Sequence, residues 1–158
     1  MREEATGGDS EMSQDGVASA EGTAWRSELS VPPDLSALGD VRRSFDAFAL
    51  PPDVRDDARL LVTELVSNSI RHAALRPDER IRISAAWSGR LLKVVVRDHD
   101  HGRPVTIAGS IRPVPGAESG WGLFIVNQLA SRWGAIQEGG AGYWFELDAS
   151  ALRHRDQP

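Results

Sequence analysis

The sequence predicts an α+β fold: a two-layer sandwich in which one mostly antiparallel sheet carries helices on one face. Three observations predict it. Residues 80–87 and 91–97 read as two strands joined by a tight turn. Residues 53–74 place apolar side chains at the spacing of a buried helix face. The whole chain reads as β-α-α-β-β-loop-α-β-β, which indicates one sheet with segregated helices.

The first half of the domain is predicted to contain one strand and two helices. Residues 25–31 alternate as a strand does. Two prolines and Asp34 follow, and Asp34 is the predicted N-cap of the first helix. Pro51 and Pro52 end that helix and open the second one, at 53–74. The apolar face of the first helix consists of Leu35, Leu38, Val41, Phe45 and Phe48.

The second half is predicted to contain two hairpins around a helix. Ser88-Gly89 joins the strands 80–87 and 91–97, and residues 98–120 form a long loop. Loops of that length in compact domains are usually functional or disordered. A helix is predicted from Trp121 to Trp133, with Gly134 as its stop. The closing hairpin joins residues 135–138 to residues 143–147 across a glycine-rich turn.

Length and charge predict one folded domain between two tails. Residues 1–24 hold one basic and six acidic residues and few apolar ones, which indicates a disordered acidic tail. A solubilising extension is favoured for this tail over a docking arm. Residues 25–148 form the domain, and residues 149–158 form a polar C-terminal tail. The part of the chain after residue 24 is neutral, so it is not a basic nucleic-acid binder.

The composition also bears on the compartment of the protein. The chain has no cysteine, which excludes disulfides and thiolate metal sites. It has no apolar run of the roughly 20 residues that a membrane-spanning helix needs, and no apolar signal-peptide region at its start. These observations predict a cytoplasmic protein that is not bound to a membrane.

The first candidate site lies on the predicted helix 53–74. Glu64, Asn68 and His72 are each four residues apart, which places them along one stripe of the helix. A carboxylate one turn from a carboxamide can supply a general base and a metal ligand to one site. Glu and Asn are uncommon on a buried helix face without such a role. Taken alone, however, the pattern also fits a solvated helix surface.

The second candidate site follows the strand 91–97. Asp98 at a strand end can accept a hydrogen bond from an exocyclic amine, and Gly102 lets the backbone approach a flat ligand. An ordinary Asp/Gly turn is the competing interpretation. Two histidines and two aspartates within residues 98–101 also raise a transition-metal site, although adjacent turn positions seldom converge on one ion.

The third candidate site opens the predicted helix at residue 121. Gly120 and Gly122 flank its start, and Leu123 follows them. Free backbone N–H groups and partial positive charge at a helix N-terminus suit phosphate. Arg103 and Arg112 in the preceding loop can add positive charge, although loop arginines are more often simply solvated.

Joined in this order, the three clusters resemble the GHKL (Bergerat-fold) ATPases, which include DNA gyrase, Hsp90, sensor histidine kinases and MutL. Residues 64–72 resemble the N box, 98–102 the G1 box and 120–123 the G2 box. The short single-domain chain, with its helix 61–73 and its strand 143–147, most closely resembles the anti-sigma-factor serine/threonine kinases. The resemblance covers about residues 25–148 and implies the Bergerat fold, also called the histidine-kinase-like ATPase fold.

The resemblance implies a role for each matching residue. ATP and Mg²⁺ are the implied ligands, with Glu64 as the catalytic general base and Asn68 as the Mg²⁺ ligand. Asp98 would bind the adenine amine, and Gly102 would let the ring sit close. The other implied nucleotide-binding residues are His72, Arg103, Gly120, Gly122 and Leu123.

Two positions depart from the pattern of that family. Asp100 replaces the first glycine of the usual G1 box and adds a negative charge near the nucleotide. Gly142 stands where the closing strand usually places a threonine near the adenine. Asp100 is expected to weaken ATP binding or alter lid movement, and both departures favour a protein that binds ATP without transferring phosphate.

The resemblance implies a kinase that phosphorylates a small anti-anti-sigma protein and alternately sequesters a sigma factor, usually as a homodimer. A nucleotide-responsive binding module without kinase activity is the alternative. A detached sensor-kinase domain would need a phosphoacceptor helical hairpin, which residues 1–24 cannot form. A gyrase- or MutL-type ATPase would need a transducer domain after residue 147. A soluble domain without any ligand is the remaining interpretation.

Overall fold

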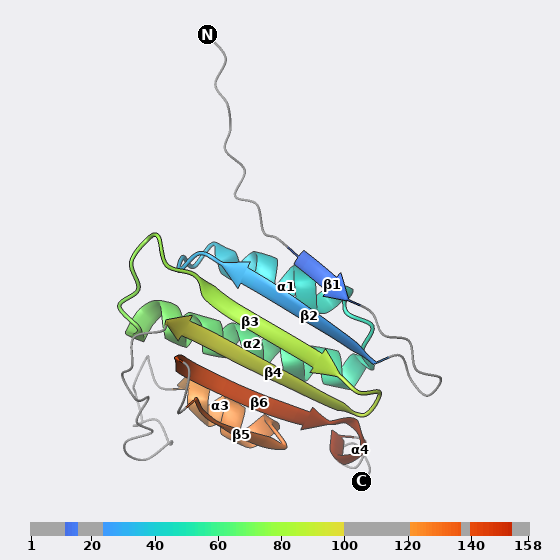
Figure 1. Ribbon diagram of the computed structural model, residues 1–158. Helices are drawn as coiled ribbons and strands as arrows, with labels where there is room; N and C mark the ends of the chain where they lie inside the picture. Colours follow the sequence, from blue (N-terminus) through green and yellow to red (C-terminus); the bar gives the residue numbers. More distant parts are fainter. Residues whose placement is uncertain (1–11, 16–23, 100–120, 137–139, 153–158) are drawn as a thin grey trace.

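A single antiparallel sheet organises the computed structural model, which describes residues 12–15, 24–99, 121–136 and 140–152. Within these residues the strands lie in the order β1-β2-β3-β4-β6-β5 (Figure 1). Every neighbouring pair is antiparallel, where the sequence predicts a mostly antiparallel sheet. The strands are β1 (Met12–Asp15), β2 (Trp25–Val31), β3 (Ile81–Trp87), β4 (Leu91–His99), β5 (Arg132–Ala135) and β6 (Ala141–Asp148).

The helices cover one face of this sheet, which confirms the predicted α+β sandwich. Figure 1 shows α1 and α2 side by side behind the strands, and α2 contacts both β4 and β6. Among the described residues, no helix has the length and apolar character that crossing a membrane requires. The helices are α1 (Ala37–Ala47), α2 (Pro52–His72), α3 (Trp121–Leu129) and α4 (Ala149–Leu152).

The core lies between the helices and the face of the sheet that they cover. Strand β3 alternates buried and less buried residues along its length, as the sequence predicts for a strand with one wet face. Helix α2 buries Leu61, Val62, Leu65 and Val66 completely. Burial of four such side chains contributes roughly 6–12 kcal/mol to the hydrophobic term, at about 1.5–3 kcal/mol each. This burial holds the polar stripe of α2 in a defined position.

The first half of the domain matches the sequence prediction except at the start of α1. Strand β2 has the predicted bounds, and α2 differs by one or two residues at its ends. Asp34, however, is not the N-cap, because Ser36 occupies that position. Asp34 Oδ1 instead accepts a hydrogen bond of 2.7 Å from the backbone N–H of Ser36 and orders the turn before the helix.

The prediction for the second half is wrong about where α3 ends. The helix stops at Leu129, and Trp133 and Gly134 belong to β5, so Gly134 is not a helix stop. Trp133 pairs with Phe145 across β5 and β6, and its Nε1–H donates to Asn127 Oδ1 at 3.1 Å. These contacts come from a distant strand, and they override a local pattern that reads as helix. The closing strand predicted at 135–138 therefore begins three residues earlier.

Both predicted tails contain residues that join the fold. Met12–Asp15, inside the predicted acidic tail, form β1 on the edge of β2. Ala149–Leu152, inside the predicted C-terminal tail, form α4, and its Ala149 and Leu152 are buried. Asp148 Oδ1 accepts from the N–H of Ser150 at 2.9 Å and so caps this short helix.

Candidate functional site

The polar stripe of α2 passes from the interior to the surface. Glu64 and Asn68 are half-buried, and His72 in the last turn is exposed. The flanking Leu65 and Val66 are fully buried, so rotation of the helix about its axis would expose apolar surface. The packing therefore holds Glu64 and Asn68 side by side at the edge of the core, as the four-residue spacing predicts.

The start of α3 lies directly against Glu64. A β-carbon at Gly122 would lie 3.1 Å from Glu64 Oε2 and 3.7 Å from Glu64 Cβ, so the absence of a side chain there permits the close approach. Gly122 is the second residue of α3, and Leu123 beside it packs against the core. The structure thus brings the first and third sequence clusters together, although about 50 residues separate them.

Asp98 lies on the side of β4 that faces the helices. Val94, Val96 and Asp98 alternate on that side, and Asp98 is 5% exposed. The sequence prediction placed Asp98 after the strand, but β4 continues to His99. The prediction was wrong because the pairing of β4 with β6 extends the strand beyond its apolar run.

A β-bulge lies at Asp98. Arg97 pairs with Gly142 and His99 pairs with Ala141, so β4 holds one more residue than β6 across this step. Bulges bend a strand, re-aim a side chain and occur frequently next to binding sites. Asp98 therefore lies at an irregular step of the sheet, at the end of β4 nearest the C-terminal end of α2 (Figure 1).

Gly142 has a structural role in this bulge. Its φ is +146°, and a β-carbon would lie 2.0 Å from the carbonyl oxygen of Val96. A threonine cannot be placed there on this backbone. The sequence interpretation treated Gly142 as the loss of a side chain near the base. The structure instead shows a position that the pairing of β4 with β6 restricts to glycine.

Tyr143 is a neighbour of Asp98 that sequence reasoning missed. It is 8% exposed on β6, and burial raises the pKa of its hydroxyl, with a further contribution from the negative charge of Asp98. The hydroxyl therefore stays protonated well above neutral pH and keeps its hydrogen for donation. No spacing in the sequence indicates this proximity, because β4 and β6 are more than 40 residues apart in the chain.

Several predicted site residues lie outside the described part of the chain. Gly102, Arg103, Asp100 and Gly120 are among them, so their predicted roles stay predictions. In the described residues, no group of three or more His, Asp or Glu side chains is arranged to hold a metal ion. Two of the four residues proposed for a transition-metal site, at positions 100 and 101, are outside that search.

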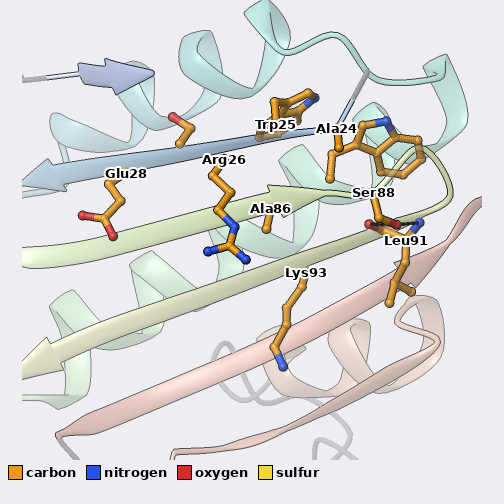
Figure 2. A pocket seen from close by; sticks show the side chains of 10 residues that line it. Ala24, Trp25, Arg26, Glu28, Ala86, Ser88, Leu91 and Lys93 are labelled. Atoms are coloured by element: carbon orange, nitrogen blue, oxygen red, sulfur yellow. Dashed lines mark hydrogen bonds between the residues drawn. The ribbon is translucent and has the colours of Figure 1, made fainter. Parts of the chain in front are cut away.

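A separate hollow lies on the other side of the sheet. Figure 2 shows Arg26, Ala86 and Lys93 on three neighbouring strands of its floor, with the helices behind them. It contains none of the predicted site residues, and Trp25, Ser88 and Leu91 line its end near the β3–β4 turn. The hollow belongs to the face that the helices do not cover, so it is distinct from the site around Glu64.

The fold and the site together define a nucleotide-binding domain. It is an α+β sandwich with Glu64 and Asn68 on one helix, a buried Asp98, and a glycine in the first turn of α3. A family model described as histidine kinase-like ATPase domain matches residues 31–146, which is most of the chain. The chain belongs to this family, and its fold is that of the family. Membership indicates that the protein binds ATP. A search of curated proteins found no match.

Proposed function

We propose that the protein is an ATP-dependent serine/threonine protein kinase of the anti-sigma-factor type. In this proposal it phosphorylates a small anti-anti-sigma protein and, in its other state, sequesters a sigma factor. It acts as a cytoplasmic homodimer. The observation that carries the proposal is the contact of Gly122 with Glu64, which places a carboxylate at the start of α3 and one turn from Asn68.

The described residues fit ATP and Mg²⁺ as ligands. Asn68 offers a neutral oxygen ligand for Mg²⁺, so water and phosphate oxygens would complete its coordination. Bound Mg²⁺ would neutralise charge on the phosphates. Asp98 is a buried carboxylate that can accept a hydrogen bond from the adenine amine. The first turn of α3 presents backbone N–H groups, which suit phosphate.

The proposed reaction needs one group that removes a proton. As the hydroxyl oxygen of the acceptor serine or threonine bonds to the γ-phosphorus of ATP, Glu64 takes the hydroxyl proton and ADP leaves. Phosphoryl transfer depends mainly on positioning and charge neutralisation, so a rigidly packed base and a nearby metal ligand supply much of what the protein must provide.

Asn68→Ala is expected to remove the Mg²⁺ dependence of ATP binding, because the side-chain oxygen that would hold the ion is lost. Calorimetric titration with ATP, with and without Mg²⁺, measures this. Asn127→Ala provides the matched control, since it removes the same amide from an exposed position of α3, where the amide oxygen accepts a hydrogen bond from Trp133. Equal Mg²⁺ dependence in the wild type and Asn68→Ala would contradict the metal-ligand assignment.

Asp98→Asn is expected to weaken ATP binding about 10–100-fold. The change replaces a charged acceptor by an amide of the same shape, and a hydrogen bond to a charged group contributes about 1.5–3 kcal/mol. The same titration measures the loss, and GTP, whose base lacks that amine, serves as a second ligand. Asp46→Asn, at an exposed ion pair with Arg59, is the control. Unchanged affinity for ATP in Asp98→Asn would remove Asp98 from the site.

Gly122→Ala is expected to lower phosphate transfer by up to about 10²-fold while the protein stays folded. The new methyl group meets Glu64 Oε2 at 3.1 Å and displaces the carboxylate, and small misplacements of a catalytic group can cost that much. Helix propensity favours alanine by about 1 kcal/mol, so unfolding should not become easier. Transfer rates and urea midpoints, measured together, separate the two effects. Normal transfer in this variant would show that the contact does not position Glu64.

A further inference from the structure

The face of the sheet away from the helices carries an excess of positive charge. We call this surface the open face and define it by the alternate residues of β2 to β6 that point away from the core. Figure 2 shows Arg26, Glu28 and Lys93 standing on it. Five basic side chains outnumber two acidic ones, apart from the Arg90–Asp148 pair at its rim. They are Arg26, Arg82, Lys93, Arg97 and Arg132, against Glu28 and Glu146.

One part of the open face is partly neutralised by ion pairs within the face. Glu146 lies 3.5 Å from Lys93 Nζ and 3.5 Å from Arg132 Nη1. Both cations also lie over the ring of Trp144, at 5.2 and 5.9 Å from its centre. This cluster accounts for two of the five basic residues and one of the two acids.

The other end of the open face holds two arginines directly opposite each other. Arg82 on β3 pairs with Arg97 on β4, and within the described residues neither guanidinium has an ion-pair partner. Like charges at directly opposed positions of an antiparallel pair are destabilising. An anionic group between them would relieve this repulsion and accept hydrogen bonds from both guanidinium groups.

The N-terminal segment enters the fold beside these arginines. Met12, the first residue of β1, pairs with Leu29, which precedes Ser30 on β2, and Ser30 pairs with Arg82. Residues 1–11 hold four acids and one arginine. Eleven residues can span up to about 36 Å, whereas β4 lies three strand spacings of about 4.8 Å from β1. Residues 1–11 are therefore long enough to reach the arginine pair, are attached near it, and carry the opposite charge.

We propose that residues 1–11 dock on the open face, with their carboxylates over Arg82 and Arg97. The segment then acts as an intramolecular competitor for acidic partners of this face. A second copy of the open face is a poor occupant, because two surfaces with the same excess of positive charge repel. This docking is independent of the proposed kinase activity, since the open face contains none of the residues assigned to ATP.

Spin labelling of the full chain tests the docking. The protein has no cysteine, so Ala5→Cys gives a single attachment site for a nitroxide. We expect the label to reduce the intensity of the amide signals of Ile83 and Val96, which adjoin the arginines on β3 and β4. The loss should disappear at about 1 M salt, where the Debye length is about 3 Å. It should also disappear when Arg82→Gln and Arg97→Gln are combined.

The control combines Arg42→Gln with Arg43→Gln, which removes the same charge from the exposed side of α1. This variant should keep the signal loss of the wild type. Signal loss confined to β1 and β2 would overturn the proposal. Equal signal loss in the Arg82/Arg97 double variant and in the Arg42/Arg43 double variant would also overturn it. A further sample mixes isotope-labelled chains that carry no nitroxide with spin-labelled chains. Signal loss in the isotope-labelled chains would also overturn the proposal, because the segment would then dock on another molecule.

Discussion

Glu64→Gln is expected to lower phosphate transfer about 10²–10⁴-fold, the usual contribution of a general base, and to leave ATP binding unchanged. Glutamine keeps the shape that packs against Gly122 but cannot take a proton from the acceptor hydroxyl. The loss should therefore fall on the transfer rate and not on the affinity. Transfer of radioactive γ-phosphate to a small candidate acceptor protein, together with calorimetry of ATP binding, measures the two quantities.

Asp53→Asn is the matched control for this experiment. It removes one carboxylate from the exposed first turn of the same helix, eleven residues before Glu64, and should leave transfer unchanged. Normal transfer in Glu64→Gln would show that another group is the base. ATP binding without transfer in the wild type, across a set of candidate acceptors, would instead favour the nucleotide-responsive binding module.

Gly142→Ala is expected to destabilise the protein by about 2–6 kcal/mol. The added β-carbon would lie 2.0 Å from the Val96 carbonyl oxygen, and this backbone atom cannot move without breaking the pairing of β4 with β6. Overpacking typically costs about 1–3 kcal/mol, and a residue held in a sparsely populated backbone region costs about 1–3 kcal/mol more. Urea unfolding monitored by tryptophan fluorescence measures the change in free energy.

Gly39→Ala makes the same substitution at a site where it should help. Gly39 lies inside α1, and a β-carbon there would meet only the end of the Arg43 side chain, at 3.4 Å. Alanine should stabilise the helix by about 0.5–1 kcal/mol. A change of opposite sign in the two variants is thus expected. Equal stability of Gly142→Ala and the wild type would mean that the bulge adopts a different backbone from the one described.

The two glycines that limit this site differ in how visible they are in the sequence. Gly122 belongs to a Gly-x-Gly pattern at a predicted helix start, so its importance could be inferred before its contact was known. At Gly142 the sequence indicates only a missing side chain near the base, because sequence spacing gives no sign of a bulge in another strand. The extension of β4 past Asp98 depends on the same pairing with β6, so the sequence does not predict it either.

Local patterns in the amino-acid sequence are enough to predict most helices and strands and the chemical groups that they carry. The spacing of apolar residues in α2 and the alternation in β2 and β3 are local signals, and they placed Glu64 and Asn68 on one stripe of a helix. Contacts between distant parts of the chain set where α3 ends, how far β4 extends and which basic residues of the open face oppose each other. Each of these features follows from strand pairing or helix packing between residues far apart in the chain. Such contacts override local preference because they bury more surface than the contacts within one helix or strand.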